Sequence, residues 1–491
     1  KFQISNKSRM QVGVLQVLGS QRYCLAMKVV TLVWLWGIQE SWEWLPTPRP
    51  PRIAGRDPQD TLRVPLHLPA HKTTITPTSP IDSQIDPSSP ISYTFEELTD
   101  LLDGKGRAQA CFDCYRLGVD PLWFYAKSDH VQDPLEREDV PELLATQDKG
   151  WTREQIQNAM TTTNMKKNNG LGYKTMTLLS ERFGSMEQKV SRLAKVTTCV
   201  DGTTKLLLDL VKDRLQIETV MIPWDDRQKS TLCLSSQVGC RQACTFCATG
   251  RMGKLRSLTA DEILSQMYWA SKTCRILGIY PIENVVFMGL GEPADNVEAV
   301  TRAAQNLIHP HIFQLAPRKV TISTVAPTPE AFEELGKSEV VLAWSVHASE
   351  DTLRKQLVPT TQYSMSELRS GLIRTLQGRR KRLRNTMLEV TLLDEINDSK
   401  ENAMHLAEFC RPLLEEVDGI KLVVNLIPWN DIAATSGPAA EYRKPSMDKV
   451  LEFQKVLIDH GIMCYVRTTR GDEENAACGM LATKKPTRTP T

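Results

Sequence analysis

Three cysteines, Cys240, Cys244 and Cys247, lie within one short stretch and have the spacing CxxxCxxC. Thiolates are good ligands for iron and zinc, and three of them on one loop can each hold one iron of a [4Fe-4S] cluster. The fourth iron then stays open for another ligand. Zinc is the alternative, with Cys233 as a fourth thiolate, but structural zinc cysteines usually come as two short-spaced pairs. The single run of three favours the cluster.

The elements around this loop alternate between strands and helices from about residue 206. The predicted strands are 206–209, 218–222, 231–236, 284–288, 319–324, 341–347, 387–393, 421–427 and 464–468, and the predicted helices are 260–277, 297–308, 328–335, 365–376, 400–414 and 446–459. This alternation predicts an α/β fold, a parallel sheet closed into a complete or partial (β/α) barrel. Active sites of such barrels lie at the carboxyl ends of the strands, which is where the cysteine loop falls.

The rest of the chain divides by composition. Residues 1–92 are predicted to be a disordered leader, because 45–90 are rich in Pro, Thr, Ser and Asp. The first forty residues hold five Lys or Arg and one acid, which is compatible with an organelle transit sequence; a mispredicted leader is the alternative. Residues 93–205 are predicted to form a small helical accessory domain, 206–482 the barrel domain and 483–491 a tail.

Composition excludes several classes of protein. The 491 residues are 41% hydrophobic and 24% charged, so the chain is neither fibrous nor wholly disordered. The net charge of +2 does not indicate nucleic-acid binding by itself. The apolar run 29–38 is about half as long as a membrane-spanning helix, so we expect no membrane anchor. The uneven spread of the twelve cysteines favours a reducing compartment, and we expect the CxxC pair of Cys111 and Cys114 to pack on a helix face.

Eight segments that follow one another along the chain resemble the RlmN/Cfr family of radical S-adenosylmethionine (SAM) RNA adenine methyltransferases. They are IETVMIP (217–223), TLCLSSQVGC (231–240), CTFCATG (244–250), NVVFMGLGEP (284–293), VTIST (320–324), WSVHA (344–348), NLIPWN (425–430) and VRTTRGDEENAACGML (466–481). The likeness covers about residues 206–482. It implies a partial radical SAM barrel with a [4Fe-4S] cluster held by Cys240, Cys244 and Cys247.

The resemblance also assigns the SAM site. In this family the open iron binds the amino and carboxylate groups of SAM, and the reduced cluster cleaves SAM to a 5′-deoxyadenosyl radical, with two SAM molecules used per turnover. The positions that match the family's SAM contacts are Gly291, Glu292, Ser323, Ser345, Val346, His347 and Asn430. All of them lie at or just beyond the ends of predicted strands.

Two further cysteines match the methyl-transfer steps. Carbon 2 of adenine is electron-poor and cannot attack the SAM methyl group directly. The resemblance implies that Cys478 carries the methyl group, that Cys233 releases the RNA adduct through a transient disulfide, and that Glu218 accepts a proton. An inert packing residue is the alternative for Cys233.

The implied substrate is an adenine of large-subunit ribosomal RNA of the 23S type, with transfer RNA as a further substrate. We expect a flavodoxin or ferredoxin as electron donor, no membrane, a monomer, and a location in the cytoplasm or an organelle stroma such as the chloroplast. Two local basic surfaces are candidates for RNA contact: the run 374–384, and Lys166, Lys167 and Arg182 in the accessory domain. The alternatives are Cfr-like methylation of carbon 8 and a non-catalytic RNA-binding or zinc-binding protein.

Overall fold

The computed structural model describes residues 87–125, 153–160, 171–471 and 473–483. The chain divides into two compact units, Lys1–Ser83 and Gln84–Thr491, and every described residue belongs to the second. The predicted leader up to residue 86, the predicted tail from residue 484, and the basic pair Lys166 and Lys167 lie outside the described residues.

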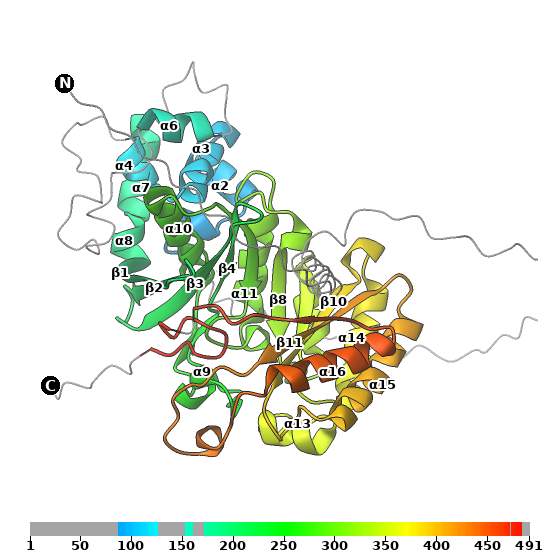
Figure 1. The fold of residues 1–491 in the computed structure, drawn as a ribbon. Helices are drawn as coiled ribbons and strands as arrows, with labels where there is room; N and C mark the ends of the chain where they lie inside the picture. Colours follow the sequence, from blue (N-terminus) through cyan, green and yellow to red (C-terminus); the bar gives the residue numbers. More distant parts are fainter. Residues whose placement is uncertain (1–86, 126–152, 161–170, 472, 484–491) are drawn as a thin grey trace, which may run out of the picture. The chain divides into compact units, whose positions relative to one another are not determined.

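One open sheet runs through the second unit in the order β1-β2-β3-β4-β7-β8-β9-β10-β11-β12 (Figure 1). Its strands are β1 (Ser191–Thr198), β2 (Thr204–Leu210), β3 (Gln216–Trp224), β4 (Lys229–Cys233), β7 (Ile282–Phe287), β8 (Val320–Thr324), β9 (Val341–Ser345), β10 (Asn385–Leu392), β11 (Lys421–Pro428) and β12 (Met463–Val466). Strands β1 to β4 pair antiparallel, and all pairs from β4/β7 to β11/β12 are parallel. Among the described strands β12 pairs only with β11, so the parallel part is a partial barrel, as predicted.

Six described α-helices precede the first strand: α2 (Phe95–Leu101), α3 (Lys105–Arg116), α4 (Pro121–Phe124), α6 (Arg153–Ala159), α7 (Tyr173–Arg182) and α8 (Met186–Lys189). The other helices follow the strands as the alternation predicts: α9 (Ala248–Met252), α10 (Ala260–Leu277), α11 (Val297–Ile308), α12 (Ala331–Gly336), α13 (Asp351–Leu357), α14 (Met365–Gly378), α15 (Lys400–Glu416) and α16 (Met447–Asp459). Helix α10 has the predicted bounds because its signals are strong. Thr259 and Glu262 form a capping box at its start, and Gly278 ends it in the left-handed conformation.

The hydrophobic core joins the accessory helices to the sheet. One cluster of buried residues runs from the helices before residue 190 to the start of β9, and a second lies around β10, β11, α14, α15 and α16. Polar contacts fix the same junction: Asn306 Nδ2 of α11 donates to the carbonyl oxygens of Ile91 at 3.1 Å and Tyr93 at 3.0 Å. The Ser88 N–H and hydroxyl donate to Asp261 of α10 at 2.9 and 3.0 Å.

One stretch of the predicted helical region is a strand. Strand β1 lies within 93–205 and pairs antiparallel with β2. Its side chains alternate in burial, with Leu193 and Val196 inside. A tight turn with Asp201 and Gly202 joins the two strands, and Gly202 has a φ of +81°. An Asp-Gly pair between alternating residues is typical of a hairpin, and the helical interpretation overlooked it.

The CxxC pair lies on α3, as expected from its spacing. Cys111 and Cys114 are both fully buried, and burial raises the pKa of both thiols well above the ordinary range. Both are therefore packing residues. No helix in the described part of the chain has the length and apolarity needed to cross a membrane.

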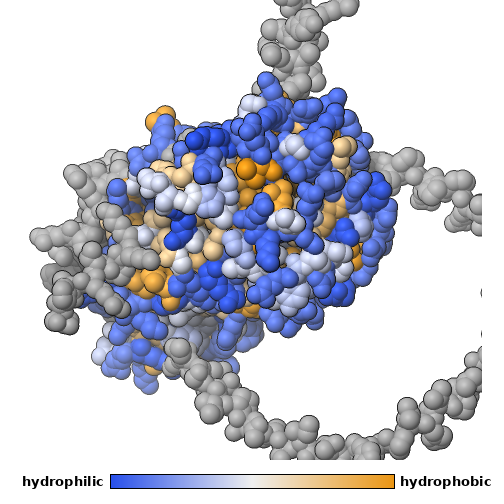
Figure 2. All heavy atoms as spheres, turned by 90° about the horizontal axis from the view of Figure 1, so that it is seen from below, coloured by the Kyte–Doolittle hydropathy of each residue, from blue (hydrophilic) through white to orange (hydrophobic). Residues whose placement is uncertain are grey.

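Two helices mark the carboxyl edge of the sheet in the figures. Helices α9 and α13 follow the carboxyl ends of β4 and β9, and both lie at the bottom of Figure 1. Figure 2 views the molecule from this side. The visible face is mostly hydrophilic and is interrupted near its centre by hydrophobic residues.

Candidate active site

The three-cysteine loop leaves the sheet at the carboxyl end of β4. Strands β5 (Gln237–Val238) and β6 (Arg256–Ser257) pair antiparallel at its base. Gly239 begins the loop with a φ of +76°, and a Cβ atom there would lie 1.8 Å from the carbonyl oxygen of Gly253. Only glycine allows this close approach of two backbone segments, so Gly239 sets the point at which the loop closes.

The three thiols of the loop are free and largely shielded from water. Cys240 and Cys244 are buried and Cys247 is half-buried. Burial raises the pKa of Cys240 to about 12, although the Gln242 N–H donates to its sulfur, and raises the pKa of Cys244 well above the ordinary range. Such thiols lose their protons when a metal takes the place of the proton.

The donor set fits a cluster better than a single ion. Among the described residues, no three His, Cys, Asp or Glu side chains converge closely enough to hold one metal ion. Cys233, the fourth ligand of the zinc alternative, interacts electrostatically with Cys478 and Arg467 and not with the three loop cysteines. In a [4Fe-4S] cluster each thiolate binds a different iron, so the three sulfurs need not meet at one point.

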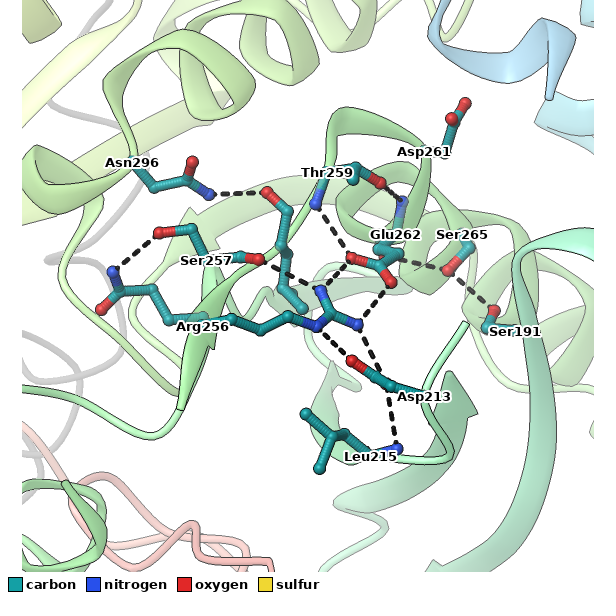
Figure 3. A network of polar contacts seen from close by, with 12 residues as sticks. Ser191, Asp213, Leu215, Arg256, Ser257, Thr259, Asp261, Glu262, Ser265 and Asn296 are labelled. Atoms are coloured by element: carbon teal, nitrogen blue, oxygen red, sulfur yellow. Dashed lines mark hydrogen bonds and ion pairs between the residues drawn. The ribbon is translucent and has the colours of Figure 1, made fainter. Parts of the chain in front are cut away.

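Arg256 anchors the far end of the cysteine loop (Figure 3). Its Nη1 and Nη2 atoms donate to the Glu262 carboxylate at 2.7 and 2.8 Å, and its Nε and Nη2 atoms donate to Asp213. Glu262 also belongs to the capping box of α10, and Asp213 lies between β2 and β3. Two bidentate contacts therefore tie β6 both to α10 and to the antiparallel strands.

The Gly-Glu-Pro turn after β7 packs against the base of the loop. Gly291 has a φ of +106°, and a Cβ atom there would lie 2.6 Å from the Gln237 side chain. Gln237 Oε1 accepts the Glu292 N–H at 3.0 Å. The buried Glu292 carboxylate accepts hydrogen bonds from three donors in its own turn and at the end of β8. Burial raises its pKa to about 7 despite these bonds. The chain itself thus orients the glutamate predicted to bind SAM.

Asp295 links the same turn directly to the cysteine loop. Its carboxylate accepts hydrogen bonds from Arg241 Nε at 2.7 Å, Arg241 Nη2 at 2.6 Å and Gln242 Nε2 at 2.9 Å. Arg241 and Gln242 lie between the first and second cysteines. The turn predicted to bind SAM and the loop predicted to bind the cluster are therefore held in one fixed arrangement.

Four other predicted SAM contacts reach the same edge from neighbouring strands. Ser323 lies in β8 and Ser345 in β9, and their hydroxyl oxygens are 3.1 Å apart. Val346 follows β9 and Asn430 follows β11. Because parallel strands end at one edge, side chains far apart in the sequence come together here.

His347 contacts the cysteine loop from the end of β9. Its φ of +56° lies in the left-handed region, and its ring packs edge-on against Phe246 with 4.6 Å between centroids. Its Nδ1 atom accepts the Thr391 N–H at 3.2 Å. Burial and the nearby charge of Arg354 hold the pKa of His347 well below its ordinary value, so the ring is neutral.

Cys478 lies beside the cysteine loop although it is close to the end of the chain. The N–H of Ala248, which follows Cys247, donates to the carbonyl oxygen of Gly479 at 2.8 Å. Asn430 Nδ2 donates to the carbonyl oxygen of Cys478 at 3.0 Å. Cys478 is exposed to solvent. The position predicted to carry a methyl group is therefore both accessible and adjacent to the loop.

Cys233 ends β4 and lies near the Cys478 segment. It packs against an apolar cluster that includes Ala476 and Leu481, on either side of Cys478. Burial, together with the charge of Cys478, raises the pKa of Cys233 to about 12, and the charge of Arg467 acts against this rise. The structure thus brings two thiols from opposite ends of the barrel domain into one electrostatic environment.

Glu218 of β3 borders the same segment. Its Oε2 atom accepts the Ala482 N–H at 2.9 Å, and its Oε1 atom forms an ion pair with Lys205 Nζ at 3.0 Å. Burial raises its pKa, while Lys205 and the Ala482 N–H lower it. A buried carboxylate with a raised pKa is suited to accept a proton near neutral pH.

Two arginines at this edge are not singled out by the sequence. Arg467 follows β12, lies 3.7 Å from Glu389, and interacts electrostatically with both Cys233 and Cys478. Arg354 of α13 is fully buried. Two signals could have found Arg467, its position just after a strand and its place in the segment 466–481, but neither separates it from Arg470 in the same segment.

The basic run 374–384 lies at the opposite edge. It ends α14 and leads into β10 at Asn385, so it borders the amino ends of the parallel strands. Arg384 donates to three main-chain carbonyl oxygens, and Lys381 forms an ion pair with Asp418 at 2.6 Å. The run does not border the site, and its position gives no support to the expected RNA contact.

Comparisons with known proteins define the class. Residues 234–407 match the model of the Radical SAM superfamily. The crystal structure of a radical SAM methyltransferase from Sphaerobacter thermophilus aligns with a TM-score of 0.60 and 30% identity, over 80% of this chain and 99% of that one. The fold is that of a radical SAM methyltransferase, an enzyme class that uses a [4Fe-4S] cluster and SAM.

Similar sequences define the family. A protein from Syntrophotalea carbinolica named dual-specificity RNA methyltransferase RlmN is 33% identical over 407 residues, which cover 82% of this chain and 91% of the relative. A protein of the same name from a Marinomonas species is 40% identical over 286 residues, which cover 57% and 73%. The chain belongs to the RlmN family.

Proposed function

We propose that this chain methylates carbon 2 of an adenine in large-subunit ribosomal RNA, that transfer RNA is its second substrate, and that Cys478 carries the methyl group. The convergence of Cys478 and Cys233 beside the cysteine loop is the observation that carries the proposal. An electron-poor carbon cannot take a methyl group from SAM directly, so a carrier thiol and a releasing thiol are needed. The printed names of the relatives support RNA as the substrate.

The cluster and SAM, held at the cysteine loop and the Gly-Glu-Pro turn, supply a radical that can take a hydrogen atom from a methyl group. The other steps belong to residues of the chain. Cys478 Sγ takes the methyl group and presents it to the base at an exposed position. The carbon on Cys478 Sγ bonds to carbon 2 of the base, and Glu218 accepts the proton that leaves carbon 2. The Cys233 thiolate then bonds to Cys478 Sγ as the bond from that sulfur to the transferred carbon breaks, and this carbon takes up a proton to become the methyl group. The new disulfide keeps the odd electron of the radical, and one further electron from the low-potential donor with two protons returns both cysteines to thiols.

We assign SAM binding to the residues that the sheet gathers at its carboxyl edge. They are Gly291, Glu292, Ser323, Ser345, Val346, His347 and Asn430. The fixed link between the Gly-Glu-Pro turn and the cysteine loop supports this assignment. Two SAM molecules are used per turnover, one for the Cys478 methyl group and one for the radical, and a low-potential flavodoxin or ferredoxin supplies the electron.

Methylation analysis of RNA at single-base resolution tests the proposal. Ribosomal and transfer RNA from a host that lacks its own enzyme are compared with and without this chain, with the Cys478→Ala variant as control. We expect one adenine to gain a methyl group only with the unaltered chain, and mass spectrometry of nucleosides to identify 2-methyladenosine. The 8-methyl isomer would show Cfr-like chemistry, and the absence of any new methyladenosine would overturn the proposal.

A further inference from the structure

Arg354 is a fully buried arginine at the carboxyl edge of the sheet. Its Nη1 atom donates to the carbonyl oxygens of Ser345 and Val346, and its Nη2 atom donates to that of Val325, each at 2.6 Å. These carbonyls lie at the ends of β8 and β9. The guanidinium therefore occupies the space between two strand ends that carry proposed SAM contacts.

The charge of Arg354 has no carboxylate partner among the described ion pairs. The three carbonyl oxygens that it contacts are neutral, and its Nε atom makes no hydrogen bond within the described structure. Arginine stays protonated in proteins, and burial of an unpaired charge is costly. Burial lowers the pKa of Arg354 to about 10, and the anionic groups that oppose this effect are Cys244 and Glu292.

The electrostatic neighbours of Arg354 therefore belong to the proposed cluster and SAM sites. Cys244 is the middle cysteine of the loop, and the charge of Arg354 favours its thiolate. Phe246, two residues further on, packs against His347, which precedes α13. The helix that carries Arg354 also contacts the cysteine loop directly, because the Thr245 N–H donates to the carbonyl oxygen of Leu357, the last residue of α13, at 2.9 Å.

We propose that Arg354 is the buried counter-charge of the cluster held by Cys240, Cys244 and Cys247, and that it makes the cluster easier to reduce. A cluster with three thiolate ligands is negatively charged, and one electron from a low-potential donor adds to that charge without forming or breaking a bond. A fixed positive charge beside a ligand stabilises the more negative state, most strongly where water is excluded. The inference rests on the cluster of the proposed function and not on the carbon that is methylated.

A purely structural role for Arg354 gives a different expectation. If the side chain only joins the ends of β8 and β9, then Arg354→Lys and Arg354→Gln should disturb the site alike, because neither can reach all three carbonyls. If its charge acts on the cluster, only Arg354→Gln should change the reduction potential. Arg379 offers a matched control, since it also donates to a main-chain carbonyl and burial lowers its pKa to about 10, but it lies at the amino edge.

The test is a redox titration of the cluster in the absence of SAM and RNA. The full chain and the variants Arg354→Gln, Arg354→Lys and Arg379→Gln are loaded with iron and sulfide and titrated with dithionite, and the reduced cluster is followed by electron paramagnetic resonance. We expect a lower midpoint potential for Arg354→Gln, so that a smaller fraction of cluster is reduced at the same ambient potential. Arg354→Lys and Arg379→Gln should match the unaltered chain.

Three results would overturn the inference: an unchanged potential in Arg354→Gln, equal shifts in the glutamine and lysine variants, or a shift of the same size in Arg379→Gln. Thermal unfolding and iron content are measured on every variant. If Arg354→Gln does not fold, Arg354→Met, which fills the buried space without charge, takes its place, and a lowered potential is again required. If the unaltered chain binds no cluster, the proposed function is refuted as well. If the cluster is bound but its potential is the same in the Arg354→Gln variant, this inference alone is refuted.

Discussion

Side chains of the same kinds have different partners and different burial at the two edges of the parallel sheet. At the carboxyl edge, the charge of the buried Arg354 interacts with those of the loop cysteine Cys244 and the buried Glu292. At the amino edge, Arg379 donates to a carbonyl oxygen and its opposing charge is Glu339, which is partly exposed and also forms an ion pair with Arg380. Both edges hold arginines that bind backbone, but only at the carboxyl edge do buried ionisable groups gather.

The pKa values follow this division. Burial raises the pKa of Glu292 to about 7 and that of Cys240 to about 12, and it holds the pKa of His347 well below its ordinary value. At the amino edge, the exposed Asp418 has a pKa lowered by its partner Lys381, as in an ordinary surface ion pair. Clusters of groups shifted by burial are typical of functional sites. The carboxyl edge therefore differs from the amino edge in holding several buried ionisable groups with shifted pKa values, and not in the presence of charged residues, which both edges have.

The largest effect that we predict is the loss of the cluster. Cys240→Ala, Cys244→Ala and Cys247→Ala should each abolish cluster assembly and methylation, because one iron loses its protein ligand. Iron and sulfide analysis of anaerobically purified protein measures this. Cys410→Ala, which truncates a buried cysteine in α15, is the control and should keep the cluster. A fully active loop variant with normal iron content would show that the carboxyl edge holds no such site.

The two cysteines outside the loop should fail at different steps. Cys478→Ala should bind a cluster and cleave SAM but transfer no methyl group, because the carrier sulfur is gone. Cys233→Ala should methylate Cys478 and then stall with RNA covalently attached, because no second thiol releases the adduct. A denaturing gel of protein purified with co-expressed RNA should show a nuclease-sensitive, slowly migrating band for Cys233→Ala.

The reverse pattern would contradict this assignment. An adduct in Cys478→Ala would place the carrier at another residue, and normal turnover by Cys233→Ala would make Cys233 a packing residue of the apolar cluster that surrounds it. Cys464→Ala, a buried cysteine in β12, serves as the control and should form no adduct.

The sequence predicts the elements of the carboxyl edge better than their contacts. Strand and helix bounds follow from apolar periodicity and from end signals such as the capping box of Thr259 and Glu262. The cysteine spacing identifies the loop as a cluster site because three cysteines on one short segment are typical of a [4Fe-4S] cluster and not of structural zinc sites. Strand β1 was missed because its hairpin turn, Asp201-Gly202, was passed over in a region of helical pattern.

Residues whose role depends on the meeting of distant strands cannot be found in this way. Arg354 lies in none of the segments that resemble the family, and Arg467 is one of two arginines in the segment 466–481. Their importance rests on neighbours that only the fold brings together: Cys244 for Arg354, and Cys233 and Cys478 for Arg467. The basic run 374–384 shows the opposite error. Its charge predicts an RNA contact, but the parallel topology places it at the amino edge, away from the proposed site.

A moderate effect on the free energy of unfolding is expected from substitution of Asp261, a buried acid of the carboxyl edge that has no proposed role in methylation (Figure 3). Burial raises its pKa from 3.8 to about 6, so the folded chain binds this proton more tightly than the unfolded chain does. Its contribution to stability is therefore full at low pH and is lost as the pH rises towards 6. The rise is about 2 pKa units, and at about 1.4 kcal/mol per unit the loss is on the order of 3 kcal/mol.

Asp261→Asn should accordingly stabilise the chain above about pH 7 by up to roughly 3 kcal/mol. The asparagine oxygen can still accept the two Ser88 hydrogen bonds. Chemical denaturation at several pH values measures the gain, which should shrink as the pH falls towards 4. Asp418→Asn at the amino edge is the control: its pKa is lowered by Lys381, so that variant should gain nothing at any pH. A gain for Asp261→Asn that does not depend on pH would exclude the carboxylate charge as its cause.

The smallest effect is expected at the amino edge. The combined variant Arg380→Gln, Lys381→Gln and Arg382→Gln removes three exposed charges of the basic run. Because these side chains lie at the end of the strands opposite Cys478, methylation should stay within about twofold of the unaltered chain, and the salt dependence of RNA binding should keep its slope. Each lost phosphate contact would lower that slope by about 0.7 to 0.9, so binding measured over a range of salt concentrations reports directly on contact. A slope reduced by about 2 or more, together with weaker methylation, would place RNA across both edges and remove the distinction between them.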